Sequence, residues 1–150
     1  MHLDFTVSLP HPIQAVYAAL VDFAAIPSWQ PNVKSVEVDP PGELKLGTRV
    51  KETRVFNGKT TESLGEITEL TPLRSLRLES PMEAPSPGFV SDYRLFKEPG
   101  GTLLNFSVTF SLSGLQKLTA PLFERAARKD MAERLALLAE HLKTRAPAAP

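Results

Sequence analysis

Alternating hydrophobic and polar residues at the N-terminus predict a half-buried β-strand over residues 3–9, because a period of two places one set of side chains on one face. Pro10 and Pro12 follow, and Pro12 suits the first turn of a helix, where its missing N–H would be unpaired in any case. The hydrophobic members of the strand are Leu3, Phe5, Val7 and Leu9.

Two short helices are expected next. The first is predicted by hydrophobic residues at helical spacing. Asp22 is placed to cap a second short helix that stops before Pro27. Pro27 and Pro31 bracket Trp29, the only tryptophan, which can either line a cavity or wedge the helix pair against the sheet. The helical hydrophobic residues are Ile13, Val16, Tyr17 and Leu20.

Six more strands are predicted between residues 33 and 112. Asn57-Gly58 is the strongest hairpin signal, because both positions tolerate positive φ. Gly65, alone inside a strand, indicates a bulge or sharp bend. The predicted strands are Val33–Val38, Thr48–Phe56, Thr60–Leu70, Ser75–Ser80, Phe89–Phe96 and a last strand from Leu104 to Leu112.

A long helix is predicted at the C-terminal end from one apolar stripe with spacings near three and four. Pro121 indicates that its regular part begins near Thr119 or that a preceding turn is kinked. Opposite the stripe, Glu124 with Arg128 and Asp130 with Arg134 are spaced as ion pairs of a solvated face. The stripe comprises Leu115, Leu118, Leu122, Phe123, Ala126, Met131, Leu135, Leu138 and Leu142.

Length and composition narrow the function classes. A chain of 150 residues can bury a real core, and we expect one domain over residues 1–145 with a disordered tail at 146–150. Basic and acidic residues number 17 each, so a nucleic-acid partner is not expected, although a local charged patch stays open. The chain has no cysteine and no apolar stretch of membrane-spanning length, so we expect a cytoplasmic protein without stable membrane insertion.

Motifs for metal, phosphate or hydrolytic chemistry are missing from the sequence. His2, His11 and His141 are far apart, and no pair has the spacing of metal ligands. Gly100-Gly101 is typical of a turn, and no serine lies in a nucleophile elbow. We therefore expect no metal and no cofactor, and a homodimer is possible only as the common default for small proteins.

The order of elements resembles the START/Bet v 1-like (SRPBCC) superfamily, and within it the polyketide cyclase/dehydrase and lipid-transport family. The resemblance rests on four segments and covers about residues 1–143. It implies an α+β helix-grip fold, in which a seven-stranded curved antiparallel sheet wraps around the long C-terminal helix. The segments are Val21-Asp22-Phe23, Ile26-Pro27-Ser28-Trp29-Gln30-Pro31, Gly47-Thr48-Arg49 and Gly100-Gly101-Thr102.

Strand order predicts where a cavity would open. Turns of a meander alternate between the two ends of the sheet, so the long loop at residues 81–88 lies beside the start of the long helix. Because binding function tends to lie on loops of a rigid scaffold, we expect the entrance there. The expected ligand-binding residues are Tyr17, Trp29, Arg54, Phe56, Met82, Tyr93, Arg94, Phe106, Leu118, Leu122 and Phe123.

Two predicted strands have charged residues on a face that could point inward. Glu52 and Arg54 share one face, and Asp92 and Arg94 share another. They either point to solvent, form an internal pair such as Glu52–Arg94 or Arg54–Asp92, or serve a ligand or a reaction, because a buried charge needs a partner. Glu52 and Asp92 are thus the candidate catalytic acids.

Three function classes follow. The first is a binding or transport protein for a small hydrophobic or amphipathic molecule, such as a lipid, isoprenoid, quinone or polyketide-like aromatic compound, held by burial of apolar surface. The second is a cyclase or dehydratase that uses an inward acid with a raised pKa. The third is a protein-interaction module of the co-chaperone type, which predicts an exposed apolar patch.

Overall fold

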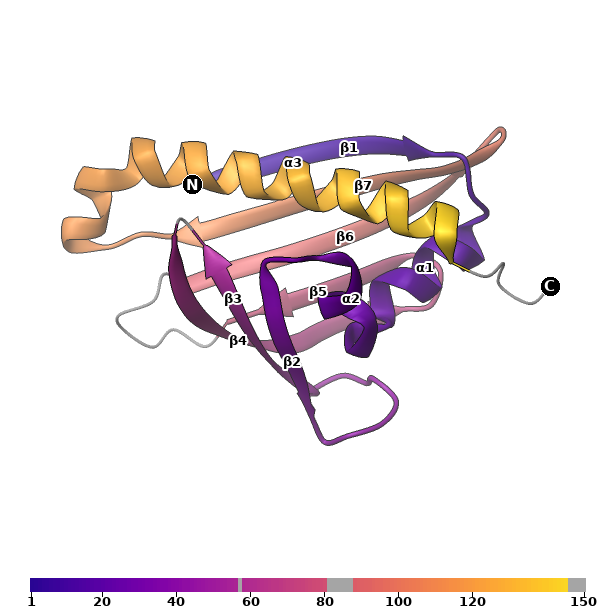
Figure 1. The fold of residues 1–150 in the computed structure, drawn as a ribbon, viewed down its shortest axis with the longest axis horizontal. Coiled ribbons are helices and arrows are strands. Elements are labelled where there is room, and N and C mark those ends of the chain that lie inside the picture. The colour runs from indigo at the N-terminus through magenta and orange to yellow at the C-terminus, as the bar shows by residue number, and fades with distance from the viewer. Residues whose placement is uncertain (57, 81–87, 146–150) are drawn as a thin grey trace.

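The protein's structure is a computed structural model that describes residues 1–56, 58–80 and 88–145. The first strand leads into a helical segment, six strands joined by turns follow, and the long helix is the last element (Figure 1). The elements are β1 (His2–Leu9), α1 (Ile13–Val21), the 3-10 turn η1 (Phe23–Ala25), α2 (Ile26–Trp29), β2 (Val33–Asp39), β3 (Arg49–Phe56), β4 (Lys59–Thr71), β5 (Ser75–Glu79), β6 (Gly88–Glu98), β7 (Gly101–Ser111), the 3-10 segment η2 (Gly114–Thr119) and α3 (Ala120–Thr144).

The seven strands form one antiparallel sheet in the order β1-β7-β6-β5-β4-β3-β2. The sheet is a meander from β2 to β7, and β1 completes it by pairing with β7 along its whole length. The sheet curves around α3, which runs along its inner side, while α1 and α2 close one end (Figure 1). The predicted α+β helix-grip architecture is therefore confirmed.

The helical segment differs from the prediction at Asp22 and Pro27. Asp22 makes no side-chain capping hydrogen bond; its carboxylate pairs instead with Arg145 at 3.0 Å. Pro27 lies inside the first turn of α2 and does not end a helix, because a proline in the first turn removes no helical hydrogen bond. Pro121 occupies the same kind of position in α3, which confirms that the regular helix begins near Thr119.

Gly65 does not form the predicted bulge. It pairs with Val50 in regular register, and the irregularity lies two residues later, between Ile67 and Glu69. The missing side chain at Gly65 instead allows Leu78 to approach the backbone closely, since an added Cβ would lie 3.2 Å from Cδ2 of Leu78. The predicted hairpin is consistent with the pairing of Phe56 and Lys59. Asn57 itself lies outside the described residues, as does the predicted tail at 146–150.

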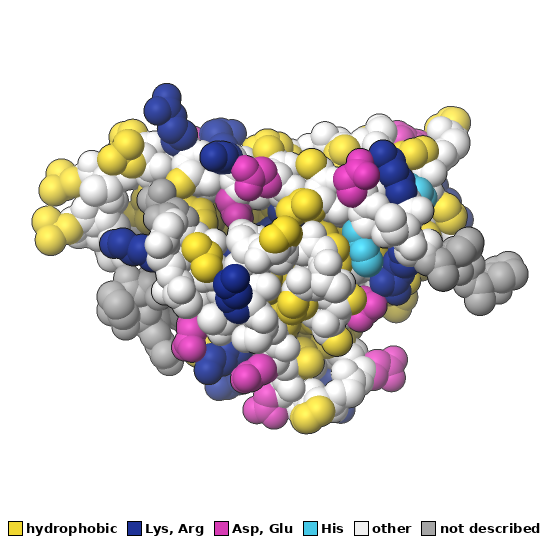
Figure 2. Space-filling view, viewed as in Figure 1, with side chains coloured by type: hydrophobic (Ala, Val, Ile, Leu, Met, Phe, Trp, Pro, Cys, Tyr) yellow, Lys and Arg dark blue, Asp and Glu magenta, His cyan; other side chains and the backbone are white. Residues whose placement is uncertain are grey.

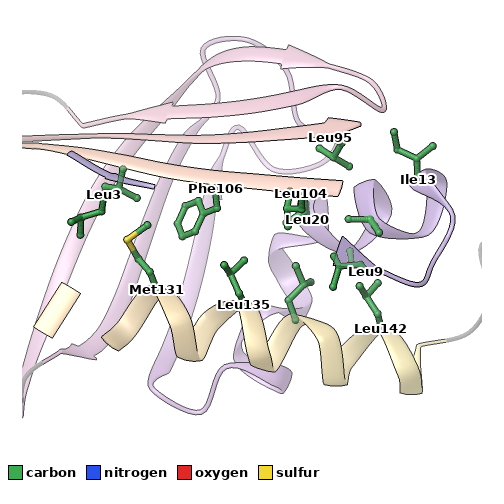
Figure 3. Close-up of a cluster of buried hydrophobic side chains, with 14 of the residues drawn as sticks. Leu3, Leu9, Ile13, Leu20, Leu95, Leu104, Phe106, Met131, Leu135 and Leu142 are labelled. Carbon is green, nitrogen blue, oxygen red and sulfur yellow. The ribbon is translucent and has the colours of Figure 1, made fainter. Parts of the chain in front are cut away.

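The hydrophobic core consists of two clusters. The larger joins α1 and most of α3 to β1, β6 and β7 (Figure 3), and its members Leu3, Val16, Leu104 and Phe106 are fully buried. The smaller contains Phe23, Val50, Ile67 and Leu76. In α3 the buried residues begin only at Ala127, so the start of this helix contributes little to the core.

Gly101→Ala is expected to destabilise the protein by about 3 kcal/mol. Its Cβ would collide with the backbone carbonyl oxygen of Leu9, where β1 ends beside β7, and backbone cannot yield as a side-chain tip can. Gly100→Ala is the matched control: it has φ +81° and no atom near the new Cβ, so only backbone strain of about 1 kcal/mol is expected. Urea denaturation measures both, and equal losses would show that the collision is relieved.

Candidate functional site

One face of β3 points at α3. Val50 is buried in the smaller core cluster, and Arg54, four residues later on the same face, contacts Asp130 of α3. Because side chains alternate along a strand, Glu52 and Phe56 lie on this inner face as well. The interior of the grip therefore holds two charged residues of β3, and the expectation that they point to solvent is wrong.

Four charged residues form what we call the inner charge network: Glu52, Arg54, Asp130 and Arg134. Arg54 donates to Asp130 Oδ1 from Nη2 at 2.7 Å and lies 3.2 Å from Glu52. Arg134 donates to Asp130 Oδ2 at 3.3 Å, and Asn32 donates its amide to Oδ1 at 3.2 Å. The exposed fractions of the four side chains are only 12–21%. Through these hydrogen bonds Asp130 connects α3 to β3 and to the turn between α2 and β2.

Burial and neighbouring charges act on the two arginines in opposite ways. Burial and the nearby Arg134 lower the pKa of Arg54 despite its two acidic partners. Burial also opposes the charge on Arg134, but Tyr93, Glu52 and Asp130 outweigh it and raise the pKa of Arg134. Both remain cations at neutral pH. With two cations and two anions, the network is balanced.

The inner charge network has unused donors. The Nε atoms of Arg54 and Arg134 are buried, and neither has a hydrogen-bond partner among the described residues. An unpaired buried N–H costs about 1–3 kcal/mol, and such groups in native proteins are satisfied by water, an ion or a ligand. Both donors lie between the sheet and α3, where a bound molecule could accept from them.

Aromatic side chains share the interior with the network. Phe123 of α3 packs edge-on against Phe110 at 4.9 Å and against Phe56 at 5.9 Å between ring centroids; we call these three the inner aromatic cluster. Tyr93 stacks on the buried Phe106 at 4.4 Å, and the guanidinium of Arg134 lies 5.5 Å from the centroid of that ring. The aromatic cluster and Tyr93 are only partly buried, so solvent reaches these inward rings.

β6 presents its charged residues to the other side of the sheet. Tyr93 pairs with Phe106, a core residue of β7, so the neighbouring Asp92 and Arg94 face outward. Asp92 pairs with Arg77 and Arg94, at 3.2 and 3.3 Å. The predicted pairs Glu52–Arg94 and Arg54–Asp92 are therefore wrong, and the structure does not bring Asp92 or Arg94 to the interior.

Trp29 joins the helical segment to α3. Its indole stacks on His141 with ring centroids 5.2 Å apart and the planes 12° from parallel. Burial, and to a smaller degree Arg145, lower the pKa of His141, so the neutral imidazole is favoured in this stack. The stacking partner belongs to α3, so this contact differs from the predicted wedge of the helix pair against the sheet.

Tyr17 lines a different space, at the end of the molecule that carries α1. A pocket of about 650 Å³ lies there under the β2–β3 connection, opposite to the predicted entrance, and burial raises the pKa of Tyr17. Met82, on the predicted entrance loop, lies outside the described residues. The pocket is lined by Tyr17, Val21, Asp22, Phe23, Ala24, Val38, Gly42, Glu43, Leu44, Lys45, Leu46, Leu70 and Pro72.

Leu118 and Leu122 are not brought to the inner face. Their exposed fractions are 77% and 70%, whereas the next residue, Phe123, turns inward. Within the first part of the predicted stripe, Leu115, Leu118 and Leu122 therefore face solvent and Phe123 faces inward, while the fully buried residues of α3 begin at Ala127.

Comparison with known proteins places the fold in a family. The family model described as polyketide cyclase / dehydrase and lipid transport matches residues 1–143. The chain belongs to this family. No curated protein matches the sequence.

Solved structures share the fold of this family member. TTHA0849 from Thermus thermophilus superposes with a TM-score of 0.81 at 21% identity, covering 96% of this chain and 98% of that one. The Zhui aromatase/cyclase from Streptomyces sp. R1128 gives 0.78 at 16% identity, with 97% and 96% covered. Ara h 8.0201 gives 0.74 at 20% identity, with 97% and 99% covered. At these identities the likeness concerns the fold alone.

Sequence reasoning missed two residues of the site. Asp130 and Arg134 were assigned to the solvated face of α3, yet they complete the inner charge network. Their positions relative to the buried residues were a usable signal: Asp130 follows Ala127 by three residues, and Arg134 precedes Leu138 by four. Residues at these spacings share a helix face.

Proposed function

We propose that the protein binds a small hydrophobic or amphipathic molecule between the inner face of the sheet and α3. Candidates are a lipid, an isoprenoid, a quinone or a polyketide-like aromatic compound. The observation that carries the proposal is the composition of this interior, which holds partly exposed aromatic rings together with a nearly buried charge network that has two donors without partners among the described residues. Family membership supports it.

The two parts of the interior suit different parts of one molecule. The inner aromatic cluster offers apolar rings to an apolar body, and burial of such surface contributes about 25 cal/mol per Å². The Nε atoms of Arg54 and Arg134 can donate to a carbonyl or hydroxyl oxygen. Because the charges of the network are balanced, a ligand with a neutral polar end is favoured over an ionised one.

A cyclase or dehydratase activity is the second candidate, and the inward position of Glu52 favours it. Of the two candidate acids, Asp92 faces the other side of the sheet. Glu52 would have to leave its contact with Arg54 to exchange a proton with a substrate. Glu52→Gln separates the candidates, since a carrier retains affinity for its ligand whereas an enzyme loses turnover.

Phe123→Ala is expected to weaken binding of the neutral apolar dye Nile red about tenfold, because the lost ring contact is worth at least about 1.4 kcal/mol. Phe96→Ala is the matched control, since Phe96 is exposed on the outer face of β6. Fluorescence titration measures both affinities, and native mass spectrometry of freshly purified protein tests for a retained ligand.

Three results would contradict the proposed position of the ligand site. One is the absence of saturable dye binding, and another is equal dye affinity of Phe123→Ala and Phe96→Ala. Alternatively, Leu44→Gln in the pocket near α1 would abolish binding while Phe123→Ala left it intact, which would move the site to that pocket. Circular dichroism spectra check that each variant is folded.

A further inference from the structure

Three leucines in η2 and the first turn of α3 belong to neither hydrophobic core cluster of the described residues. The exposed fractions of Leu115, Leu118 and Leu122 are 81%, 77% and 70%, the three largest among the exposed large hydrophobic residues of the described chain. They lie at the end of the molecule where η2 and the first turn of α3 extend past the strands (Figure 1). Hydrophobic side chains gather on this end in the space-filling view (Figure 2).

The segment that carries the leucines has a defined local structure. Ser113 and Gln116 form a capping box, in which each side chain bonds the other residue's backbone. Pro121 then starts α3 in its first turn. The capping box satisfies backbone donors at the start of η2, and the three leucines are exposed on this ordered segment and the first turn of α3. Keeping three large apolar side chains in water is unfavourable, which calls for a surface that covers them.

Basic side chains flank the leucines. Arg125 and Lys129 are exposed and follow Leu122 by three and seven residues, so all three lie on one stripe of α3. Lys117 is exposed between Leu115 and Leu118. The one acidic residue between Ser113 and Lys129 is Glu124, which Arg128 pairs at 3.0 Å. The surface is therefore apolar at its centre and positive at its edge, although the whole chain is neutral.

We propose that this leucine surface, Leu115, Leu118 and Leu122 with Lys117, Arg125 and Lys129, docks on a membrane that contains anionic lipid. Apolar side chains on one helix face with lysine and arginine beside them are the features of an interfacial helix. Each basic residue near an anionic bilayer adds attraction that salt screens. The docking is peripheral, since no helix among the described residues is long and apolar enough to cross a membrane.

A second copy of the chain fits this surface less well. In a two-fold dimer the same patch would face itself. Lys117, Arg125 and Lys129 of both copies would then lie close together, and like charges across an interface are unfavourable. An anionic bilayer can bury the leucines and attract the basic residues beside them. Charge complementarity therefore favours the bilayer over a second copy of the chain.

Vesicle co-sedimentation tests the proposal. The wild-type protein should bind vesicles of phosphatidylcholine with phosphatidylglycerol, bind pure phosphatidylcholine more weakly, and dissociate as salt rises. The triple variant Leu115→Gln, Leu118→Gln, Leu122→Gln should lose about tenfold or more in vesicle affinity. Leu46→Gln is the matched control, because Leu46 is 65% exposed on the β2–β3 connection at the other end. All substituted residues are exposed, and circular dichroism verifies the fold.

The outcomes separate this proposal from its rivals and from the ligand site. Equal vesicle binding by the triple variant and Leu46→Gln would overturn it, as would absence of wild-type binding. A wild-type dimer that the triple variant converts to a monomer, measured by light scattering, would show a self-interface instead. Docking does not depend on the proposed ligand: Phe123→Ala should keep vesicle binding, and the triple variant should keep Nile red affinity.

Discussion

Asp130→Ala is expected to lower the free energy of unfolding by about 4 kcal/mol. Asp130 accepts hydrogen bonds from Arg54, Arg134 and Asn32, and its side chain is mostly buried. Removing it leaves two guanidinium groups between the sheet and α3, with Glu52 as the one nearby acid among the described residues. Breaking a buried ion pair from one side costs about 3–5 kcal/mol, because the remaining charge keeps its desolvation cost and loses its partner.

Glu124→Ala is the control for this variant. Glu124 also forms an ion pair four residues along α3, with Arg128, but both side chains are substantially exposed. Such a pair contributes about 0.3–0.5 kcal/mol. Urea denaturation of both variants measures the difference. Similar losses would mean that the inner charge network is solvated like a surface pair, and would remove the electrostatic basis of the proposed site.

A second substitution identifies the cause of the loss. If an uncompensated cation destabilises Asp130→Ala, then adding Arg134→Met should recover part of the stability, because it removes one unpaired charge and keeps an apolar side chain of similar length. If the loss came only from missing hydrogen bonds to Asn32, the second substitution would destabilise further. The double-mutant cycle therefore reports directly on charge burial.

The strands could be predicted because their signals are local. Alternating residues in β7 and the glycine or proline turns between strands predict the order of the elements. They also predict the bounds of the strands to within a few residues of those observed. The connection of β1 to β7 cannot be read in this way, since residues about 100 positions apart pair there. The family resemblance implied a seven-stranded antiparallel sheet without specifying this pairing, and the structure shows it.

The faces of β3 and β6 could not be predicted because each strand carries apolar and polar residues on both sides. What orients β6 is the pairing of Tyr93 with Phe106, and what orients β3 is the approach of Asp130 from α3. Both are tertiary contacts. The spacing of Asp130 and Arg134 by itself fits an exposed pair and an inward pair equally well, and only their positions relative to the buried Ala127 and Leu138 distinguish the two.

The predicted apolar stripe begins earlier in the sequence than the buried residues of α3 do, for a related reason. Helical periodicity shows which residues share a face, but it does not show how far the opposing sheet extends. The buried residues of α3 begin at Ala127, and the segment before them, which carries the exposed leucines, extends past the strands (Figure 1). A pattern typical of a core helix thus became an exposed surface.

Phe106→Ala is expected to cost about 4 kcal/mol of stability and to disorganise the proposed ligand site. Phe106 is fully buried in the larger core cluster, and removal of such a ring costs about 3–5 kcal/mol through lost burial and a cavity. Its ring also supports Tyr93 by stacking and lies against the guanidinium of Arg134. Both side chains face the proposed ligand, so their loss of support should reach beyond the core.

Two variants separate these effects in denaturation and Nile red titrations. Phe106→Leu keeps most of the apolar volume but loses the stacking and the cation–π contact, so we expect a stability loss of about 1.5 kcal/mol with a clear decrease in dye affinity. Phe96→Ala, on the outer face, should change neither quantity by much. If Phe106→Leu bound the dye as the wild type does, the orientation of Tyr93 and Arg134 would not matter for binding, and the polar end of the ligand would have to be recognised by Glu52 and Arg54 alone.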